Sequence, residues 1–273
     1  MYLCSSLILI LGILIYFKIR KNKLEVICDT HIWYELGNSE KELVNDKNVI
    51  LVTTFNSIDE FSRTENLLIN PEYTMKGIQA MFKYSRNHAI YEPPLIYLKK
   101  LADPNYNYDI NSELGTILEF TSKVANGVKI DFDKSEEYSN FCKSRKDDLA
   151  FVSNIFNEES ANIKARIKNL KNHRKEDSLP INRDLISLFV ASATKSDGIP
   201  TGFDWKQIEL FENVLKVYFN SLETGEYKSE PNDWFDLFLL IYVQPNRKLW
   251  TKEKKWLTLI KRANMSHYLF TNT

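Results

Sequence analysis

The chain has 273 residues, of which 44% are hydrophobic, so it can bury a sizeable core in one large or two small domains, and this excludes extensive disorder. Lysine plus arginine and aspartate plus glutamate both number 36, so the field of the whole protein favours no polyanionic partner and any nucleic-acid-binding surface must be local. The three cysteines, Cys4, Cys28 and Cys142, have no CxxC spacing, which argues against a disulfide framework and against a zinc site.

The N-terminus carries a long uncharged apolar run. The run LCSSLILILGILIYF covers residues 3–17, and four basic residues gather between positions 18 and 23. This order predicts a retained membrane anchor in residues 1–22, in contact with the bilayer over residues 3–19, with the rest of the chain facing the cytoplasm. A cleaved secretory signal would carry its charge before the apolar run. A buried helix of the globular domain is the other alternative.

Strands and helices alternate in the segment that follows. Residues 24–28 (LEVIC) and 48–54 (NVILVTT) have the apolar, β-branched composition of short buried strands. A helix is expected after each, the second with its N-cap at Asn56 or Ser57. A third strand begins at His88 and passes into a helix at a pair of prolines. This alternation predicts a parallel sheet covered by helices on both faces.

The middle of the chain, from about residue 110 to 228, has helical periodicity and little strand character. We interpret it as a helical insertion in the α/β domain. Basic side chains gather in one part of it, at Lys164, Arg166, Lys168, Lys171, His173, Arg174 and Lys175. Two interpretations of this basic cluster stay open, a solvated helix face and a surface that contacts the phosphate backbone of RNA or DNA.

The last part of the chain returns to alternation. An apolar helix is expected from residue 232 to Pro245, followed by a strand at 248–251 (KLWT), a helix at 253–264 and a final strand at 265–270 (MSHYLF). Together with the earlier elements, this order predicts a three-layer α/β/α fold with a central parallel sheet of about five strands.

Carboxylates stand at or near the ends of these strands. Asp29 follows the first strand, Glu60 lies in the helix after the second, Asp233 and Asp236 open the apolar helix, and Glu253 follows the KLWT strand. Because the carboxyl ends of parallel strands meet at one edge of a sheet, we expect these acids to converge. Clustered carboxylates raise one another's pKa unless a cation neutralises them, and oxygen ligands suit Mg²⁺ or Mn²⁺. Taken singly, Asp29 is also a good helix N-cap, and Glu60 and Glu253 are also ordinary helix and surface acids.

Four segments of the chain carry a family resemblance. In order, they read VICDTHIW, TTFNSIDEFSR, NDWFDLFLLIYV and LWTKEKKW. This order resembles the PIN-domain family, whose members are mostly metal-dependent ribonucleases. The family's strand-end Asp and hydroxyl residue correspond to Asp29 and Thr30, and its Glu in the helix after the second strand corresponds to Glu60.

The third and fourth motifs of the family lie near the end of this chain. The Asp that opens an apolar helix corresponds to Asp236 or Asp233. The fourth motif is Thr-x-Asp in the family, and this chain has Thr251 with Glu253 in place of the Asp, which keeps the charge and lengthens the reach. The resemblance covers roughly residues 24–104 and 230–270.

The resemblance implies a PIN-like domain at residues 23–273, with the helical insertion at about 110–228. It implies an endoribonuclease that hydrolyses RNA phosphodiester bonds, single-stranded RNA among them, and the N-terminal anchor would tether this enzyme to the membrane. The implied catalytic residues are Asp29, Glu60, Asp236 and Thr251, with Asn56 as a helper. The implied ligands of Mg²⁺ or Mn²⁺ are Asp29, Glu60, Asp233, Asp236 and Glu253. In this chemistry the metal activates water, so no catalytic His or Ser is required.

Two other functions are weighed against the nuclease. The first is a catalytically silent PIN-like scaffold, held at the membrane by its anchor, with a protein partner or inhibitor bound on the helical insertion. The second is a phosphatase with a strand-end Asp. It is disfavoured because DTHIW has no second Asp two residues after Asp29 and no Lys is clearly placed at a strand end.

Overall fold

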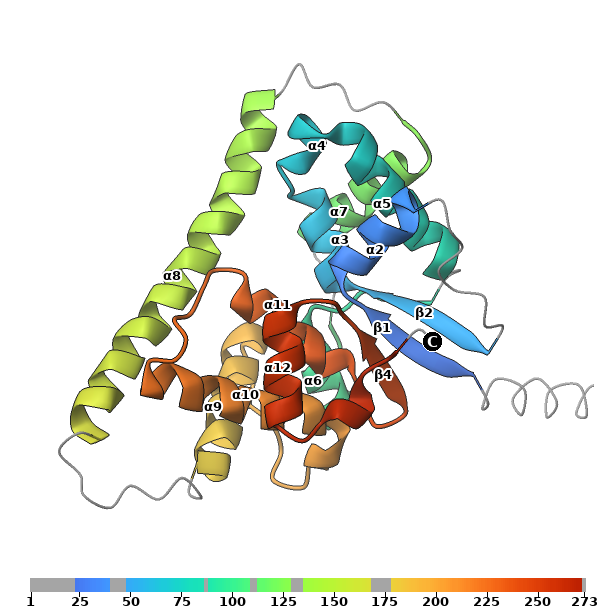
Figure 1. Cartoon of the computed structure of the whole chain (residues 1–273). Helices are drawn as coiled ribbons and strands as arrows, with labels where there is room; N and C mark the ends of the chain where they lie inside the picture. The colour runs from blue at the N-terminus through green and yellow to red at the C-terminus, as the bar shows by residue number, and fades with distance from the viewer. Residues whose placement is uncertain are drawn as a thin grey trace, which may run out of the picture.

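The computed structural model describes residues 23–39, 48–85, 88–108, 112–128, 135–167 and 178–271. Within these ranges the strands form one parallel sheet of β1 (Leu24–Cys28), β2 (Val49–Thr54), β3 (Ala89–Ile90) and β4 (Arg247–Trp250). Their order across the sheet is β3-β2-β1-β4, so the first strand lies between the second and the last. Figure 1 shows the sheet between two groups of helices, which confirms the predicted α/β class with a parallel sheet.

Alternation of side chains along the strands explains why both faces of the sheet are covered. In β1, Val26 and Cys28 belong to one core and Ile27 belongs to the other, and all three are fully buried. Leu51 and Val52 of β2 divide between the two cores in the same way. A parallel sheet whose strands are apolar on both sides is stable only when helices cover each side.

On the face of Val26 and Cys28, the covering helices follow the first strands in the chain. They are α2 (Thr30–Asn38), α3 (Phe55–Ser62), α4 (Asn66–Ile69), α5 (Pro71–Ser85) and α7 (Ser112–Ala125). Helices α2 and α5 approach each other closely at Gly37, where an added Cβ would lie 2.2 Å from the carbonyl oxygen of Lys76. Glycine at this position therefore permits the contact between the two helices.

The opposite face carries the larger core, which surrounds Ile27. It is built from α6 (Pro94–Ala102), α9 (Ser178–Thr194), the 3₁₀ helix η3 (Trp205–Ile208), α10 (Glu209–Thr224), α11 (Asp233–Leu239), the 3₁₀ helix η4 (Leu240–Tyr242) and α12 (Lys254–Arg262). Phe211, Leu215 and Tyr218 of α10 are fully buried in it. Part of the segment predicted as a helical insertion thus contributes directly to the main core.

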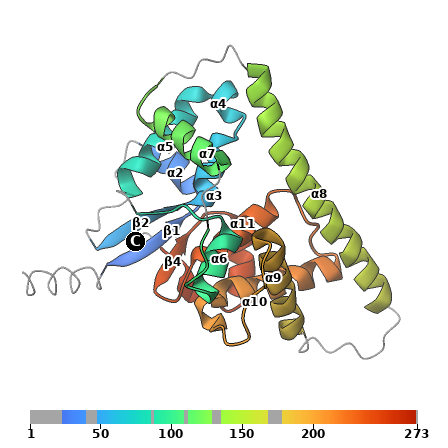
Figure 2. The same cartoon turned by 180° about the vertical axis from the view of Figure 1, so that it is seen from behind.

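The longest helix, α8 (Ser135–Ile167), lies along one side of the molecule. In Figures 1 and 2 it runs from the end occupied by α4 and α7 to the end occupied by α9 and α10. Its inward residues Tyr138, Cys142, Leu149, Ser153 and Asn157 are buried or half-buried. These positions follow three- and four-residue spacing, which places them on one face of the helix.

The final predicted strand is wrong, and within the described residues the sheet has four strands instead of about five. Residues Ser266–Tyr268 form the 3₁₀ helix η5, and only Leu269 makes an isolated parallel bridge, with Leu249. The side chain of Tyr268 explains the difference, since it turns into the core and its hydroxyl donates to Glu209 Oε2 over 3.2 Å. An extended backbone across residues 265–270 would move the Tyr268 side chain out of the core.

Two helix ends also differ from the prediction. Asn56 and Ser57 lie inside α3, whose N-cap is Thr54, because both side chains bond elsewhere: Asn56 donates to the Phe235 carbonyl and Ser57 to the Cys28 carbonyl. The apolar helix expected to reach Pro245 ends earlier, with α11 closing at Leu239 and passing into η4.

Two predicted features fall outside the described residues. No helix in the described ranges is long and apolar enough to cross a membrane, and the anchor assigned to residues 1–22 lies before those ranges begin. The basic cluster at residues 164–175 also lies where no side chain is described.

Candidate functional site

The order of the strands creates a crevice at the carboxyl edge of the sheet. The chain leaves β1 toward β2 and β3 on one side and returns to β4 on the other, so the connections diverge between β1 and β4. In open α/β sheets, ligands bind at such a switch point, beyond the carboxyl ends of the strands. Asp29 directly follows β1 and Thr251 directly follows β4. The backbone N–H of Asp29 donates to the Trp250 carbonyl over 3.0 Å, which holds the two strand ends together.

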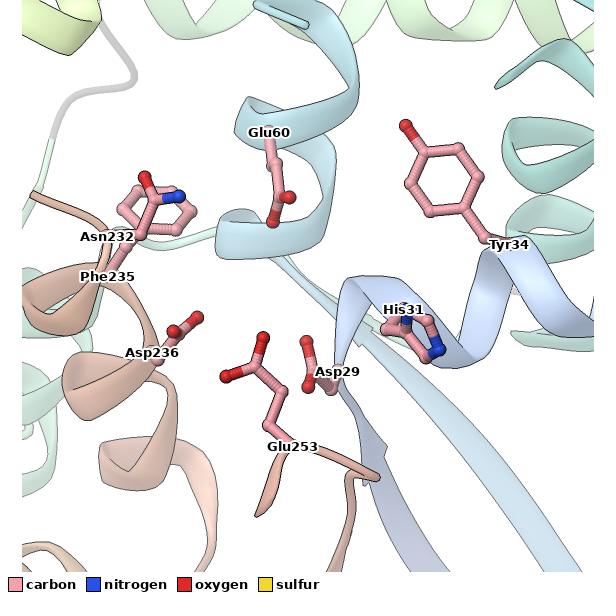
Figure 3. A pocket seen from close by; sticks show the side chains of 8 residues that line it. All are labelled: Asp29, His31, Tyr34, Glu60, Asn232, Phe235, Asp236 and Glu253. Carbon is pink, nitrogen blue, oxygen red and sulfur yellow. The ribbon is translucent and has the colours of Figure 1, made fainter. Parts of the chain in front are cut away.

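A pocket of about 150 Å³ occupies this crevice. The residues that line it are Asp29, His31, Tyr34, Glu60, Asn232, Phe235, Asp236 and Glu253. Figure 3 shows the carboxylates of Asp29, Glu60, Asp236 and Glu253 directed toward the same space. The structure therefore brings together four of the five acids that the sequence proposed as metal ligands, and they come from four separate parts of the chain.

Asp29 is held in the pocket by its neighbour on β4. It occupies the N-cap position of α2 but makes no side-chain capping bond. Instead, the hydroxyl of Thr251 donates to Asp29 Oδ2 over 2.7 Å. Burial raises the pKa of Asp29, and the Thr251 hydrogen bond offsets part of that rise because it favours the ionised form. The carboxylate thus keeps one oxygen oriented by Thr251.

The carboxylate of Asp236 is perturbed by the other three acids of the pocket. Burial raises the pKa of Asp236 well above its ordinary value, and the charges of Asp29, Glu253 and Glu60 raise it further. The indole N–H of Trp256 donates to Asp236 Oδ2 over 3.0 Å and lowers the pKa by a smaller amount. These effects show that the four acids share one electrostatic environment.

Asp233 lies three residues before Asp236 but does not line the pocket. Its carboxylate is paired with Lys255 Nζ at 2.5 Å, and it also accepts hydrogen bonds from the Tyr218 hydroxyl at 2.8 Å and the Glu230 backbone N–H at 2.9 Å. Asp233 therefore joins the start of α11 to α12, and its carboxylate oxygens are engaged by protein donors instead of facing the pocket.

Thr251 and Glu253 occupy the turn between β4 and α12. The Thr251 hydroxyl orients Asp29 and also accepts the backbone N–H of Glu253 over 3.2 Å. The family resemblance implied a catalytic role for Thr251, and the structure shows its hydroxyl bonded to the Asp29 carboxylate that faces the pocket. Glu253 is exposed at the rim, where partial burial and the charge of Asp29 raise its pKa.

Several pocket residues were missed by sequence reasoning. Asn232 and Phe235 form one wall and His31 and Tyr34 another, and Trp256 supports Asp236 from outside. Helical spacing was the available signal for Asn232, because a residue four positions before Asp236 shares its face. No comparable signal identifies the indole of Trp256 as a donor, because that contact depends on how α12 packs against α11.

Asn56, proposed as a helper, lies behind the pocket wall. Its Nδ2 donates to the Phe235 carbonyl over 2.7 Å and so ties α3 to α11. The side chain is buried, and among the described residues its Oδ1 has no hydrogen-bond partner. The tie joins the helix of Glu60 to the helix of Asp236.

The chemistry of the pocket fits a divalent cation. Its charged lining groups are carboxylates, with His31 at the edge, and none of the eight lining residues is a lysine or an arginine. Oxygen donors of this kind suit Mg²⁺ or Mn²⁺. Across the described ranges, however, no group of three or more His, Cys, Asp or Glu side chains is drawn together closely enough to hold a metal ion. The pocket thus contains carboxylates of the right chemical type, but they are not drawn together into a complete coordination shell.

Comparison with family models, with curated proteins and with solved structures gave no match for this chain.

Proposed function

We propose that this protein is a PIN-like, metal-dependent endoribonuclease that hydrolyses phosphodiester bonds of RNA. The observation that carries the proposal is the meeting of Asp29, Glu60, Asp236 and Glu253 in one pocket without a lysine or arginine among its lining residues. Such a cluster of negative charge, with Asp29 buried and Asp236 half-buried, favours an external cation. The position of the pocket at the switch point of a parallel sheet supports a role in ligand binding.

In this proposal Asp29, Glu60 and Asp236 hold the cation, and Glu253 closes the rim. When bound, a divalent ion supplies positive charge that activates water and neutralises the oxygen that leaves phosphorus. Thr251 fixes the orientation of Asp29, and Trp256 does the same for Asp236. The half-buried ring of Phe235 gives an RNA base a surface on which to stack beside the reacting phosphodiester.

The test combines metal binding and cleavage. We expect Mg²⁺ or Mn²⁺ to raise the melting temperature of the wild-type protein and to support cleavage of single-stranded RNA. Asp29→Asn and Asp236→Asn should abolish both effects. Glu72→Gln is the matched control, since Glu72 is an exposed acid paired with Lys76 on α5, away from the pocket. Unchanged melting with metal, together with cleavage that survives Asp29→Asn, would contradict the proposal.

The membrane tether is part of the proposal and has a separate test. Residues 3–19 contain the uncharged apolar run, and the basic residues after it support a main domain that faces the cytoplasm. The full-length chain should therefore sediment with membranes and resist extraction by salt and alkali. The domain should be digested by protease added from the cytoplasmic side. Release by salt alone would exclude an integral anchor.

A catalytically silent scaffold is the second candidate, and one observation favours it. Two acids of the pocket already accept hydrogen bonds, Asp29 from Thr251 and Asp236 from Trp256, and the described side chains form no closed metal shell. A scaffold would use the fold to bind a protein partner, and the four acids would then have no cation to hold. It predicts no metal stabilisation and no effect of Asp29→Asn on partner binding.

A further inference from the structure

Helix α8 is attached to the rest of the protein at two places that lie on opposite sides of the pocket. Near its N-terminus it meets the end of α3, the helix that carries Glu60. Farther along it meets the segment before α11, the helix that carries Asp236. Figures 1 and 2 show α8 spanning the distance between these two groups of helices.

The first attachment is made by Tyr138. Its hydroxyl lies 3.0 Å from the carbonyl oxygens of both Ser62 and Thr64, at and just beyond the end of α3. The last carbonyls of a helix have no partner inside the helix, so this hydroxyl caps α3 two residues after Glu60. Burial raises the pKa of Tyr138 far above its ordinary value, which keeps the phenol protonated and able to donate.

Charged and aromatic contacts strengthen the first attachment. Lys146 of α8 pairs with Glu65 at 2.7 Å, and the guanidinium of Arg63 lies 5.0 Å from the ring centroid of Phe141. All of these contacts involve the short segment between α3 and α4. That segment is therefore fixed to α8 by an aromatic hydroxyl, an ion pair and a cation–π contact.

The second attachment is made by Asn157. Its Nδ2 donates to the Ser229 carbonyl over 3.0 Å, and its Oδ1 accepts the Ser229 backbone N–H over 2.8 Å. The hydroxyl of Ser229 in turn accepts a hydrogen bond from the indole N–H of Trp234 at 3.2 Å and lies 3.0 Å from the Tyr218 hydroxyl. A displacement of Ser229 is thus transmitted to α11, the helix that begins four residues later.

We infer that α8 is a brace that sets the separation of Glu60 and Asp236, and that Tyr138 and Asn157 are positioning residues for the pocket. The two attachments are 19 residues apart on an uninterrupted helix, which corresponds to about 28 Å of rigid length. A rod fixed at both ends resists movement of the two helical layers apart. A direct side-chain tie between α3 and α11 also exists, the hydrogen bond from Asn56 to the Phe235 carbonyl. The role of α8 as a brace follows from the contacts alone, and the inference rests on the proposed function only where it assigns a cation to the pocket.

A double-mutant cycle tests the brace. Tyr138→Phe removes the first hydroxyl and Asn157→Ala removes the second pair of hydrogen bonds. Sites separated by more than roughly 10 Å normally contribute additively. A brace predicts non-additive effects. Releasing either end of α8 already frees α3 and α11 to move apart, so the double variant should show the same effect as each single variant.

Two readouts are needed. The first is amide hydrogen exchange of residues 55–62 and 233–239 in the metal-free, full-length protein, where each single variant should speed exchange in both helices. The second is Mn²⁺ affinity, which each single variant should weaken by roughly tenfold, as expected for groups that hold ligands in place. Asn157→Gln keeps the amide but changes its reach, and should weaken Mn²⁺ binding although it can still form hydrogen bonds.

Matched controls separate the brace from local damage. Tyr268→Phe removes a hydroxyl that bonds to Glu209 away from α8, and Phe151→Ser changes a side chain that is 67% exposed on α8. Neither should alter exchange in α3 or Mn²⁺ affinity. Additive effects of Tyr138→Phe and Asn157→Ala, or faster exchange confined to the helix next to each substitution, would overturn the brace. If the wild-type protein binds no Mn²⁺ while exchange is non-additive, the proposed function fails and the brace stands.

Discussion

The hydroxyl of Thr251 donates a hydrogen bond to Asp29 Oδ2 over 2.7 Å, and these two residues are 222 positions apart in the chain. Thr251→Val keeps the shape of the side chain and removes the donor. We expect Mn²⁺ affinity to fall roughly 10- to 100-fold, the usual range for a group that orients a metal ligand. Thr251→Ser retains the hydroxyl and should stay close to wild type. Isothermal titration with Mn²⁺ measures both affinities, and a loss in Thr251→Ser with none in Thr251→Val would show that the methyl group, not the hydroxyl, matters.

Asp236→Asn should stabilise the metal-free protein at neutral pH. The pKa of Asp236 is raised in the folded state, so the stability contributed by its protonated form is complete below its ordinary pKa and is lost as pH rises through the raised value. Asparagine cannot ionise, so it escapes that loss. The difference in melting temperature between the variant and wild type should be small near about pH 4 and positive and larger at about pH 7.5.

Glu72 provides a control for the pH dependence of Asp236→Asn, because its pKa is shifted in the opposite direction. Lys76 lowers the pKa of Glu72, so Glu72→Gln should be neutral or slightly destabilising above the ordinary pKa of a glutamate. Added Mn²⁺ should narrow the gap between wild type and Asp236→Asn at the higher pH, because only wild type keeps the full ligand set. A gap independent of pH would contradict the electrostatic account of Asp236.

Lys255→Met should destabilise the fold. The substitution leaves the buried carboxylate of Asp233 without its cation, and breaking a buried pair costs about 3 kcal/mol or more. Lys254→Met, at an exposed neighbouring position, should stay within about 0.5 kcal/mol of wild type. Urea denaturation gives both free energies of unfolding. The double variant Asp233→Asn with Lys255→Met should recover part of the loss, since it leaves no unpaired charge.

Phe235→Ala should weaken binding of single-stranded RNA. A base stacked on an aromatic ring contributes about 1–3 kcal/mol, so KM should rise roughly tenfold while kcat changes less. Phe235→Leu retains apolar volume without an aromatic face and should resemble the alanine variant. If leucine restores the wild-type KM, the wall acts by excluding water and not by stacking.

Gly37→Ala tests the close contact of α2 and α5. The new methyl group would meet the Lys76 carbonyl at 2.2 Å, so overpacking should cost about 1–3 kcal/mol in spite of the better helix propensity of alanine. Gly115→Ala on α7 meets no atom within 4 Å and should gain up to about 1 kcal/mol. Thermal unfolding of the two variants should therefore shift in opposite directions.

Local sequence signals predicted the fold class and the strands from β1 to β4, because buried β-branched runs followed by helical periodicity have few alternative interpretations. They also pointed to Asp29, Glu60 and Asp236, since the carboxyl ends of parallel strands share an edge. The sequence could not separate Asp233 from Asp236. That distinction depends on Lys255, which lies 22 positions after Asp233 and reaches it only through tertiary packing.

The positions missed by sequence reasoning share one physical cause. Tyr138 and Asn157 are polar-tipped residues on a charged helix, where they look like solvent-facing positions until their distant partners are known. Trp256 looks like a core residue, and its indole N–H acquires a role only when α12 docks against α11. The expected strand at residues 265–270 failed for a similar reason, because burial of Tyr268 overrode a short apolar pattern.

The central place of β1 has a consequence for biosynthesis. β1 pairs with β4 from Glu25 to Cys28, yet β4 emerges from the ribosome more than 200 residues later. Until then, one edge of β1 lacks its neighbour, and Asp29 lacks both Thr251 and the wall formed by α11. A nascent chain can therefore assemble the half of the pocket that contains Asp29 and Glu60 but not the complete pocket. The complete pocket, and with it the proposed nuclease activity, would form only after β4 has docked, and that step is slowed by the long loop that it must close.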